Sequence, residues 1–110
     1  MQMTSERALK TAIVRSLKEQ GILAWRNPVG PFSNAGLPDI LAVLPRGRLL
    51  AIEAKAPGRY KNVMSGLTPT QHAWCDALRK AEALVIVTDS LSDFRICLAE
   101  ALQANREDTQ

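Results

Sequence analysis

The chain has 110 residues, 46% of them hydrophobic and 23% charged, which fits one compact domain over residues 1–110 and leaves little room for a second. The first residues, MQMTSERALK, lack the apolar stretch of a signal peptide, and no apolar run approaches the roughly 18 residues that indicate a membrane span, so we expect a soluble, cytoplasmic protein. The net charge of +3 divides unevenly: ten Lys or Arg against four acids in residues 1–61, and four against seven in residues 62–110.

The first predicted element is a helix over residues 5–20. Apolar Leu9, Ile13 and Leu17 recur at helical spacing and form one stripe. A threonine and a serine at the start can cap the helix, and Gly21 follows where a helix should stop. We expect this stripe to pack on a sheet.

Three short strands should follow the helix. Residues 22–26 form the first, and residues 27–36 are rich in Pro, Gly and Asn, which is typical of an irregular loop. Residues 39–44 and 48–55 are apolar, partly β-branched runs, and residues 45–47, Pro-Arg-Gly, can join them as a β-hairpin.

The rest of the chain continues as helix, strand and helix. Thr68 can cap a helix, because a Pro follows it in the first turn and a Gln follows three residues later. This helix should run to about Lys80. Residues 83–88 form an apolar strand, central or parallel in its sheet. A final helix begins near residue 91, and a polar tail from about residue 105 should fray. The order αβββαβα predicts an α/β fold, a mixed β-sheet flanked by helices.

Charged residues interrupt the apolar strands at two places. Asp39 follows Pro38, and Glu53-Ala54-Lys55 comes after thirteen intervening residues. Strand side chains alternate between faces, so Glu53 and Lys55 project from the same side while Ala54 points away and leaves its backbone carbonyl available. Pairing of the two strands can bring Asp39 beside Glu53.

Buried charges without a partner are unfavourable, and a bound cation would stabilise them. Asp39, Glu53 and the Ala54 carbonyl offer hard oxygen ligands suited to Mg²⁺ or Mn²⁺. The cation could polarise a phosphate and lower the pKa of a bound water, and Lys55 could orient that water. This pattern indicates phosphodiester hydrolysis. The alternative is a Glu53 to Lys55 surface pair on an edge strand, with Asp39 as a turn residue.

The motifs and their order also resemble a known family. PD and EAK on consecutive strands resemble the PD-(D/E)XK nuclease signature, and GLPDILAV, LLAIEAKAPG and LTPTQHAW in this order are similar to the VRR-NUC family, the virus-type replication-repair nucleases, which include minimal stand-alone phage versions. The resemblance covers nearly the whole chain. It implies a restriction-endonuclease-like core.

The resemblance also implies roles for individual residues. Asp39 and Glu53 would be metal ligands and Lys55 the motif lysine. Glu6, the glutamate of the first helix, would contribute to the metal site, either directly or through a water. Gln71 would contact the lysine, a metal-bound water or the phosphate. The alternatives are that Glu6 is a first-turn acid stabilised by the helix dipole, and that Gln71 only completes a capping box.

Further cations and one aromatic residue lie in sequence near the strand ends. They can hold phosphates or stack on a base, and we expect them to form a DNA-binding rim: Arg26, Asn27, Arg59, Tyr60 and Lys61. The net +6 of residues 1–61 also favours an anionic partner. The alternative is a solvated basic surface with no specific partner.

Together these features predict a Mg²⁺- or Mn²⁺-dependent DNA endonuclease. The resemblance implies a homodimer with a preference for branched DNA such as Holliday junctions, as in DNA repair. Symmetric cutting of two strands by a chain with one site also requires two copies. A second hypothesis is a non-catalytic nucleic-acid-binding module that keeps this fold. A third, a purely structural α/β protein, leaves the charges inside an apolar strand unexplained.

Overall fold

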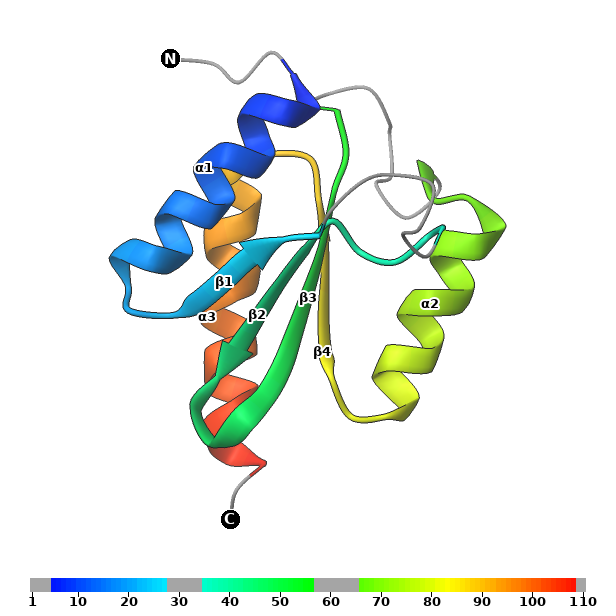
Figure 1. Ribbon diagram of the computed structural model, residues 1–110. Helices are drawn as coiled ribbons and strands as arrows, with labels where there is room; N and C mark the ends of the chain where they lie inside the picture. Colours follow the sequence, from blue (N-terminus) through cyan, green and yellow to red (C-terminus); the bar gives the residue numbers. More distant parts are fainter. Residues whose placement is uncertain (1–4, 28–34, 57–65, 109–110) are drawn as a thin grey trace.

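Within residues 5–27, 35–56 and 66–108, which the computed structural model describes, four strands form one mixed sheet and three α-helices lie against it (Figure 1). The strands are β1 (Leu23–Arg26), β2 (Ile40–Leu44), β3 (Arg48–Ala54) and β4 (Leu84–Thr88), arranged in that order across the sheet. The helices are α1 (Glu6–Glu19), α2 (Pro69–Lys80) and α3 (Leu91–Glu107). The predicted order αβββαβα and the α/β class are confirmed.

Helix α1 forms where its apolar stripe predicts. The Ser5 hydroxyl caps it by accepting a hydrogen bond from the Ala8 amide at 3.0 Å. Leu9, Ile13 and Leu17 are fully buried in the core. The chain leaves the helix at Gly21, whose φ of 74° is a conformation that glycine adopts without strain. The buried stripe holds α1 on the sheet and thereby fixes the position of its first turn.

Strands β2 and β3 form the predicted hairpin, with Ile40 opposite Ile52 and Leu44 opposite Arg48. The connection is a short 3₁₀ turn, η1 (Pro45–Gly47), in which Arg46 and Gly47 both have positive φ. We call this side of the molecule the hairpin end. The opposite side, where β3 and β4 finish, is the carboxylate end.

Strand β4 pairs with β3 in parallel, as the sequence allowed, but it lies at the outer edge of the described sheet and is not central. Helices α2 and α3 both contact it. Its apolar character follows from this cover, because an edge strand with helices packed on it is shielded much as a central strand is.

Helix α3 continues through Glu107, past the residue where the sequence predicted a fraying polar tail. Asn105 is 3% exposed, and its amide donates to the Pro45 carbonyl at 3.3 Å. Its own carbonyl accepts a hydrogen bond from Arg46 at 2.9 Å. These contacts with the hairpin order a helical turn whose polar composition favours an exposed tail.

The helices lie on both sides of the sheet: α1 and α3 on one side, α2 on the other (Figure 1). All three helices in the described part of the chain begin at the carboxylate end, so their N-termini converge there. The outer side of β1 carries two exposed apolar side chains, Leu23 at 67% and Trp25 at 41%. Across the described ranges, no helix combines the length and apolar character needed to cross a bilayer.

Candidate active site

The hairpin register brings Asp39 and Glu53 together at the carboxylate end. Asp39 directly precedes β2, and because Ile40 pairs with Ile52, it lies opposite Glu53 on β3. The Ala54 amide donates to the Asp39 carboxylate at 3.3 Å. The Asn27 amide donates to the Asp39 carbonyl at 2.7 Å, which ties the end of β1 to the start of β2.

Glu53 is an ionisable group in an unfavourable position for a charge. The residue is 2% exposed. Burial raises the pKa of Glu53 from 4.5 to about 8, aided by the charge of Asp39 and a hydrogen bond with it, and opposed by the positive charges of Lys55 and Lys10. Two carboxylates in contact favour sharing a proton unless a cation neutralises them. A bound cation would therefore stabilise the ionised pair.

Lys55 and Gln71 close the site from the side of α2. Lys55 is 7% exposed, and its Nζ donates to Gln71 Oε1 at 2.8 Å and lies 3.8 Å from Glu53 Oε1. The Gln71 amide donates in turn to Glu53 Oε1 at 3.2 Å. Gln71 also forms the capping box of α2, since its Oε1 accepts from the Thr68 amide at 2.9 Å. The two alternatives for Gln71 thus coexist: one side chain caps the helix and bridges the acid and the lysine.

Glu6 lies farther from this cluster, and a lysine stands between it and the acids. Lys10 Nζ is 3.2 Å from Asp39 Oδ1 and 3.4 Å from Glu6 Oε1. The Glu6 side chain is 41% exposed. Sequence reasoning missed Lys10, although it lies one turn after Glu6 and directly follows the buried Leu9, which were signals for a place near the sheet.

The segment that leads into Asp39 packs on α2. The indole nitrogen of Trp74 donates to the Ala35 carbonyl at 3.1 Å. Gly36, with a φ of 84°, lies so close to Thr70 that a β-carbon on it would come within 2.6 Å of the Thr70 side chain. Trp74 is partly buried and serves this contact. The approach to Asp39 is thereby joined to the helix that carries Gln71.

The expected DNA-binding rim is only partly within the described residues. Arg26 is exposed at the end of β1. Asn27 is occupied by the backbone, because its side-chain amide donates to the Pro38 carbonyl at 3.0 Å. Arg59, Tyr60 and Lys61 lie outside the described residues. The structure therefore leaves Arg26 available for phosphate contacts and gives Asn27 a structural contact.

The donor set at the carboxylate end fits a hard divalent cation. Over the described ranges, three or more His, Cys, Asp or Glu side chains nowhere gather as a metal-binding cluster. Asp39 and Glu53 supply two carboxylates, and the Ala54 carbonyl is the expected third oxygen. Mg²⁺ is commonly held by one or two carboxylates together with waters and substrate phosphates, so a pair is sufficient.

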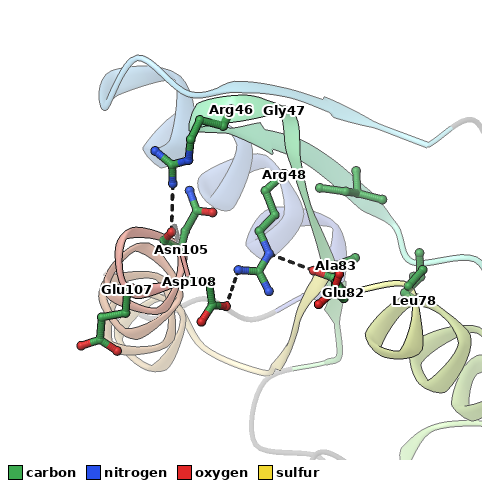
Figure 2. Close-up of a pocket in the computed structure, with 11 residues that line it drawn as sticks. Arg46, Gly47, Arg48, Leu78, Glu82, Ala83, Asn105, Glu107 and Asp108 are labelled. Atoms are coloured by element: carbon green, nitrogen blue, oxygen red, sulfur yellow. Dashed lines mark hydrogen bonds and ion pairs between the residues drawn. The ribbon is translucent and has the colours of Figure 1, made fainter. Parts of the chain in front are cut away.

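A second polar region lies at the hairpin end, in a cavity of about 840 Å³ (Figure 2). Arg48 donates there to the Glu82 carbonyl at 2.8 Å and to the Asp108 carboxylate at 2.5 Å. Arg46 reaches the Asn105 carbonyl, as drawn in the same view. No residue of the predicted site lines this cavity.

The mixed sheet and its flanking helices define an α/β protein, and its acid pair followed by a lysine is similar to the PD-(D/E)XK nuclease motif. The family model of the VRR-NUC domain matches residues 2–91, and the chain belongs to this family. A solved structure described as a VRR_NUC domain has a TM-score of 0.69 and 25% sequence identity, and the match covers 88% of this chain and 97% of that one. No curated protein matched the chain.

Family membership implies a nuclease function with DNA as substrate, and nucleases of this kind generally use divalent metals. The matched region includes every residue of the candidate site from Glu6 to Gln71. The resemblance of the sequence motifs to this family is thus confirmed.

Proposed function

We propose that this protein is a metal-dependent endonuclease that hydrolyses DNA phosphodiester bonds at the carboxylate end of the sheet. The observation that carries the proposal is the contact of the buried Glu53 with the partly buried Asp39, with Lys55 beside it. Such a like-charged pair is unfavourable by itself and becomes favourable when a cation neutralises it. A structural role alone gives no reason to bury Glu53 beside a second acid.

Each side chain has a task in this proposal. Asp39, Glu53 and the Ala54 carbonyl hold Mg²⁺ or Mn²⁺, which when bound polarises the scissile phosphate and acidifies a water. Lys55 orients the attacking water and offsets negative charge that develops on the phosphate. Gln71 keeps Lys55 in place, 2.8 Å away. Glu6, at the outer edge of the site, contributes to metal binding directly or through a water.

The fold adds a favourable field for the substrate. Helix N-termini carry partial positive charge, and three of them converge at the carboxylate end. The DNA backbone can therefore approach two acids without strong repulsion. Arg26, Arg59, Tyr60 and Lys61 are proposed as the rim that holds it.

The test compares cleavage of a linear duplex and a four-way junction in Mg²⁺, Mn²⁺ and EDTA. We expect wild type to cut only with the metal and Glu53→Gln to lose at least about 100-fold in rate. Glu100→Gln, an exposed acid on α3, is the matched control and should cut as wild type does. DNA binding without any cutting by wild type would favour the non-catalytic binding module. Cutting in EDTA would contradict the metal requirement.

The same assay tests the substrate form and the assembly. Following the family resemblance, we propose a preference for branched DNA and a homodimer, since one chain offers one site for two strands. Faster cutting of the junction than of the duplex at equal binding supports the first. Sedimentation equilibrium at the assay concentration measures the second, and a monomer that makes paired cuts would contradict it.

A further inference from the structure

Lys10 is a charged residue of the site that the proposed function leaves without a task. Its Nζ lies 3.2 Å from Asp39 Oδ1 and 3.4 Å from Glu6 Oε1. The side chain is 16% exposed, so most of it is shielded from solvent. Its positive charge also acts on Glu53, where it opposes the rise in the pKa of that carboxyl. Lys10 is therefore a positive charge shared among the acids of the site.

The position of Lys10 conflicts with the metal-binding role proposed for the acids. The ammonium contacts an oxygen of the same carboxylate that is proposed to hold a divalent cation. Two positive charges at one carboxylate repel each other, and the repulsion is stronger in a partly buried site than in water. Lys10 and a divalent cation are thus competitors for Asp39.

Lysine is suited to exchange one partner for another. Its charge is a compact ammonium on a flexible four-carbon stem, and it binds phosphate as a point charge. The residue lies in the early part of α1, at the end of the sheet where the DNA phosphates are expected. An ammonium displaced from Asp39 keeps Glu6 as a partner, 3.4 Å away, and gains a further anion when a DNA phosphate is bound.

We propose that Lys10 occupies Asp39 in place of the cation until DNA arrives, and then pairs with a DNA phosphate. This inference rests on the proposed function. It assigns Lys10 a positioning role on Asp39 in the free protein and a substrate-binding role in the complex. The consequence is coupling: DNA strengthens cation binding because it removes the competing ammonium, and the cation strengthens DNA binding by an equal factor.

Isothermal titration calorimetry of the free protein with Mn²⁺, in the absence of DNA, tests the competition. We expect Lys10→Met to bind Mn²⁺ about fivefold more tightly than wild type, the factor that corresponds to losing an ion pair of about 1 kcal/mol. Lys18→Met is the matched control, because it removes the same charge from an exposed position on the same helix, and its affinity should equal that of wild type. Lys10→Arg keeps the charge and should bind no more tightly than wild type.

An Mn²⁺ affinity of Lys10→Met equal to or weaker than that of Lys18→Met would overturn the inference. If wild type binds Mn²⁺ and cuts DNA in that case, the proposed function stands and only the role of Lys10 is wrong. If wild type neither binds Mn²⁺ nor cuts DNA, both fail. Should Lys10→Met not fold, as measured by circular dichroism, the same titration of Lys10→Gln decides.

Discussion

At the hairpin end of the sheet each arginine lies against an acceptor, whereas at the carboxylate end two acids lie against each other. Arg48 contacts the Asp108 carboxylate and the Glu82 carbonyl, and all three groups lie at the surface of an open cavity (Figure 2). Glu53 is instead buried beside Asp39, and burial raises its pKa to about 8. Charges at the hairpin end complement one another and stabilise the fold, while the carboxylate end places two acids side by side, a pair that the proposed cation would neutralise.

The direction of the helices accounts for both patterns. Since α1, α2 and α3 begin at the carboxylate end, the C-termini of α2 and α3 lie near the hairpin. Helix C-termini carry partial negative charge and favour arginine, and N-termini favour anions. The same arrangement that stabilises Arg46 and Arg48 at one end therefore makes the other end receptive to carboxylates and phosphates. Substitutions at the two ends should accordingly affect different properties.

The largest effect is expected from Lys55→Met. Removal of the buried ammonium takes away the group proposed to orient the water and offset developing charge, so the cleavage rate should fall about 10²- to 10³-fold. The measurement is single-turnover cleavage in Mg²⁺ with protein in excess over DNA. Lys80→Met, at the exposed C-terminal end of α2, is the control. A rate for Lys55→Met within about threefold of the control would remove Lys55 from the mechanism.

The second prediction concerns the pH dependence of stability without metal. The pKa of Glu53 is raised from 4.5 to about 8, so between these values the unfolded chain releases a proton that the folded chain retains. The free energy of unfolding should therefore fall as pH rises from about 5 to 8, by on the order of 3 kcal/mol, and level off above.

Urea unfolding in EDTA at several pH values measures this decline. Glu53→Gln cannot ionise and should remove most of it, while the control Glu100→Gln should retain it. Saturating Mg²⁺ should also reduce the decline, because the cation stabilises the ionised pair. A stability of wild type that stays flat or rises between pH 5 and 8 in EDTA would contradict the buried, protonated state of Glu53.

A smaller effect is expected from Gly36→Ala. The added β-carbon would overlap Thr70 and occupy a φ of 84°, so the approach to Asp39 must shift away from α2. Gly47→Ala at the hairpin is a matched control: its φ is 78°, with nothing within 4 Å of the added atom. Both should lose about 1 kcal/mol of stability to the backbone conformation, and Gly36→Ala should lose more because of the overlap with Thr70. Only Gly36→Ala should also cut DNA about tenfold more slowly. Equal cleavage by the two variants would show that this contact does not position the site.

Much of the carboxylate end could be predicted because it depends on local rules. Strand alternation places Glu53 and Lys55 on one side, and a hairpin with a short turn fixes the register that brings Asp39 opposite Glu53. The buried stripe of α1 follows from helical spacing. These features can be predicted from the sequence of one element and of the element next to it in the chain.

Other features depend on how distant elements pack, which local patterns do not specify. Lys10 reaches Asp39 only because α1 crosses the sheet at a particular place. The apolar run of β4 would suit a central strand equally well, because it indicates that the strand is covered, here by α2 and α3, and does not indicate how many strands pair with it. Asn105 belongs to a polar stretch, and its contact with the hairpin, 60 residues away, converts that stretch into helix.

The smallest effect is expected at the hairpin end, from Arg48→Met. Loss of the contacts with Asp108 and the Glu82 carbonyl should lower the free energy of unfolding by about 1 kcal/mol, because both groups are partly solvated and water replaces the lost donor. Urea unfolding measures the change against Arg95→Met, an exposed arginine of α3. Cleavage under folding conditions should stay at the wild-type rate, since β3 keeps its register through backbone hydrogen bonds. If Arg48→Met instead slowed cleavage as Lys55→Met does, the two ends of the sheet would be coupled through β3, and the division between a stabilising end and a reactive end would be wrong.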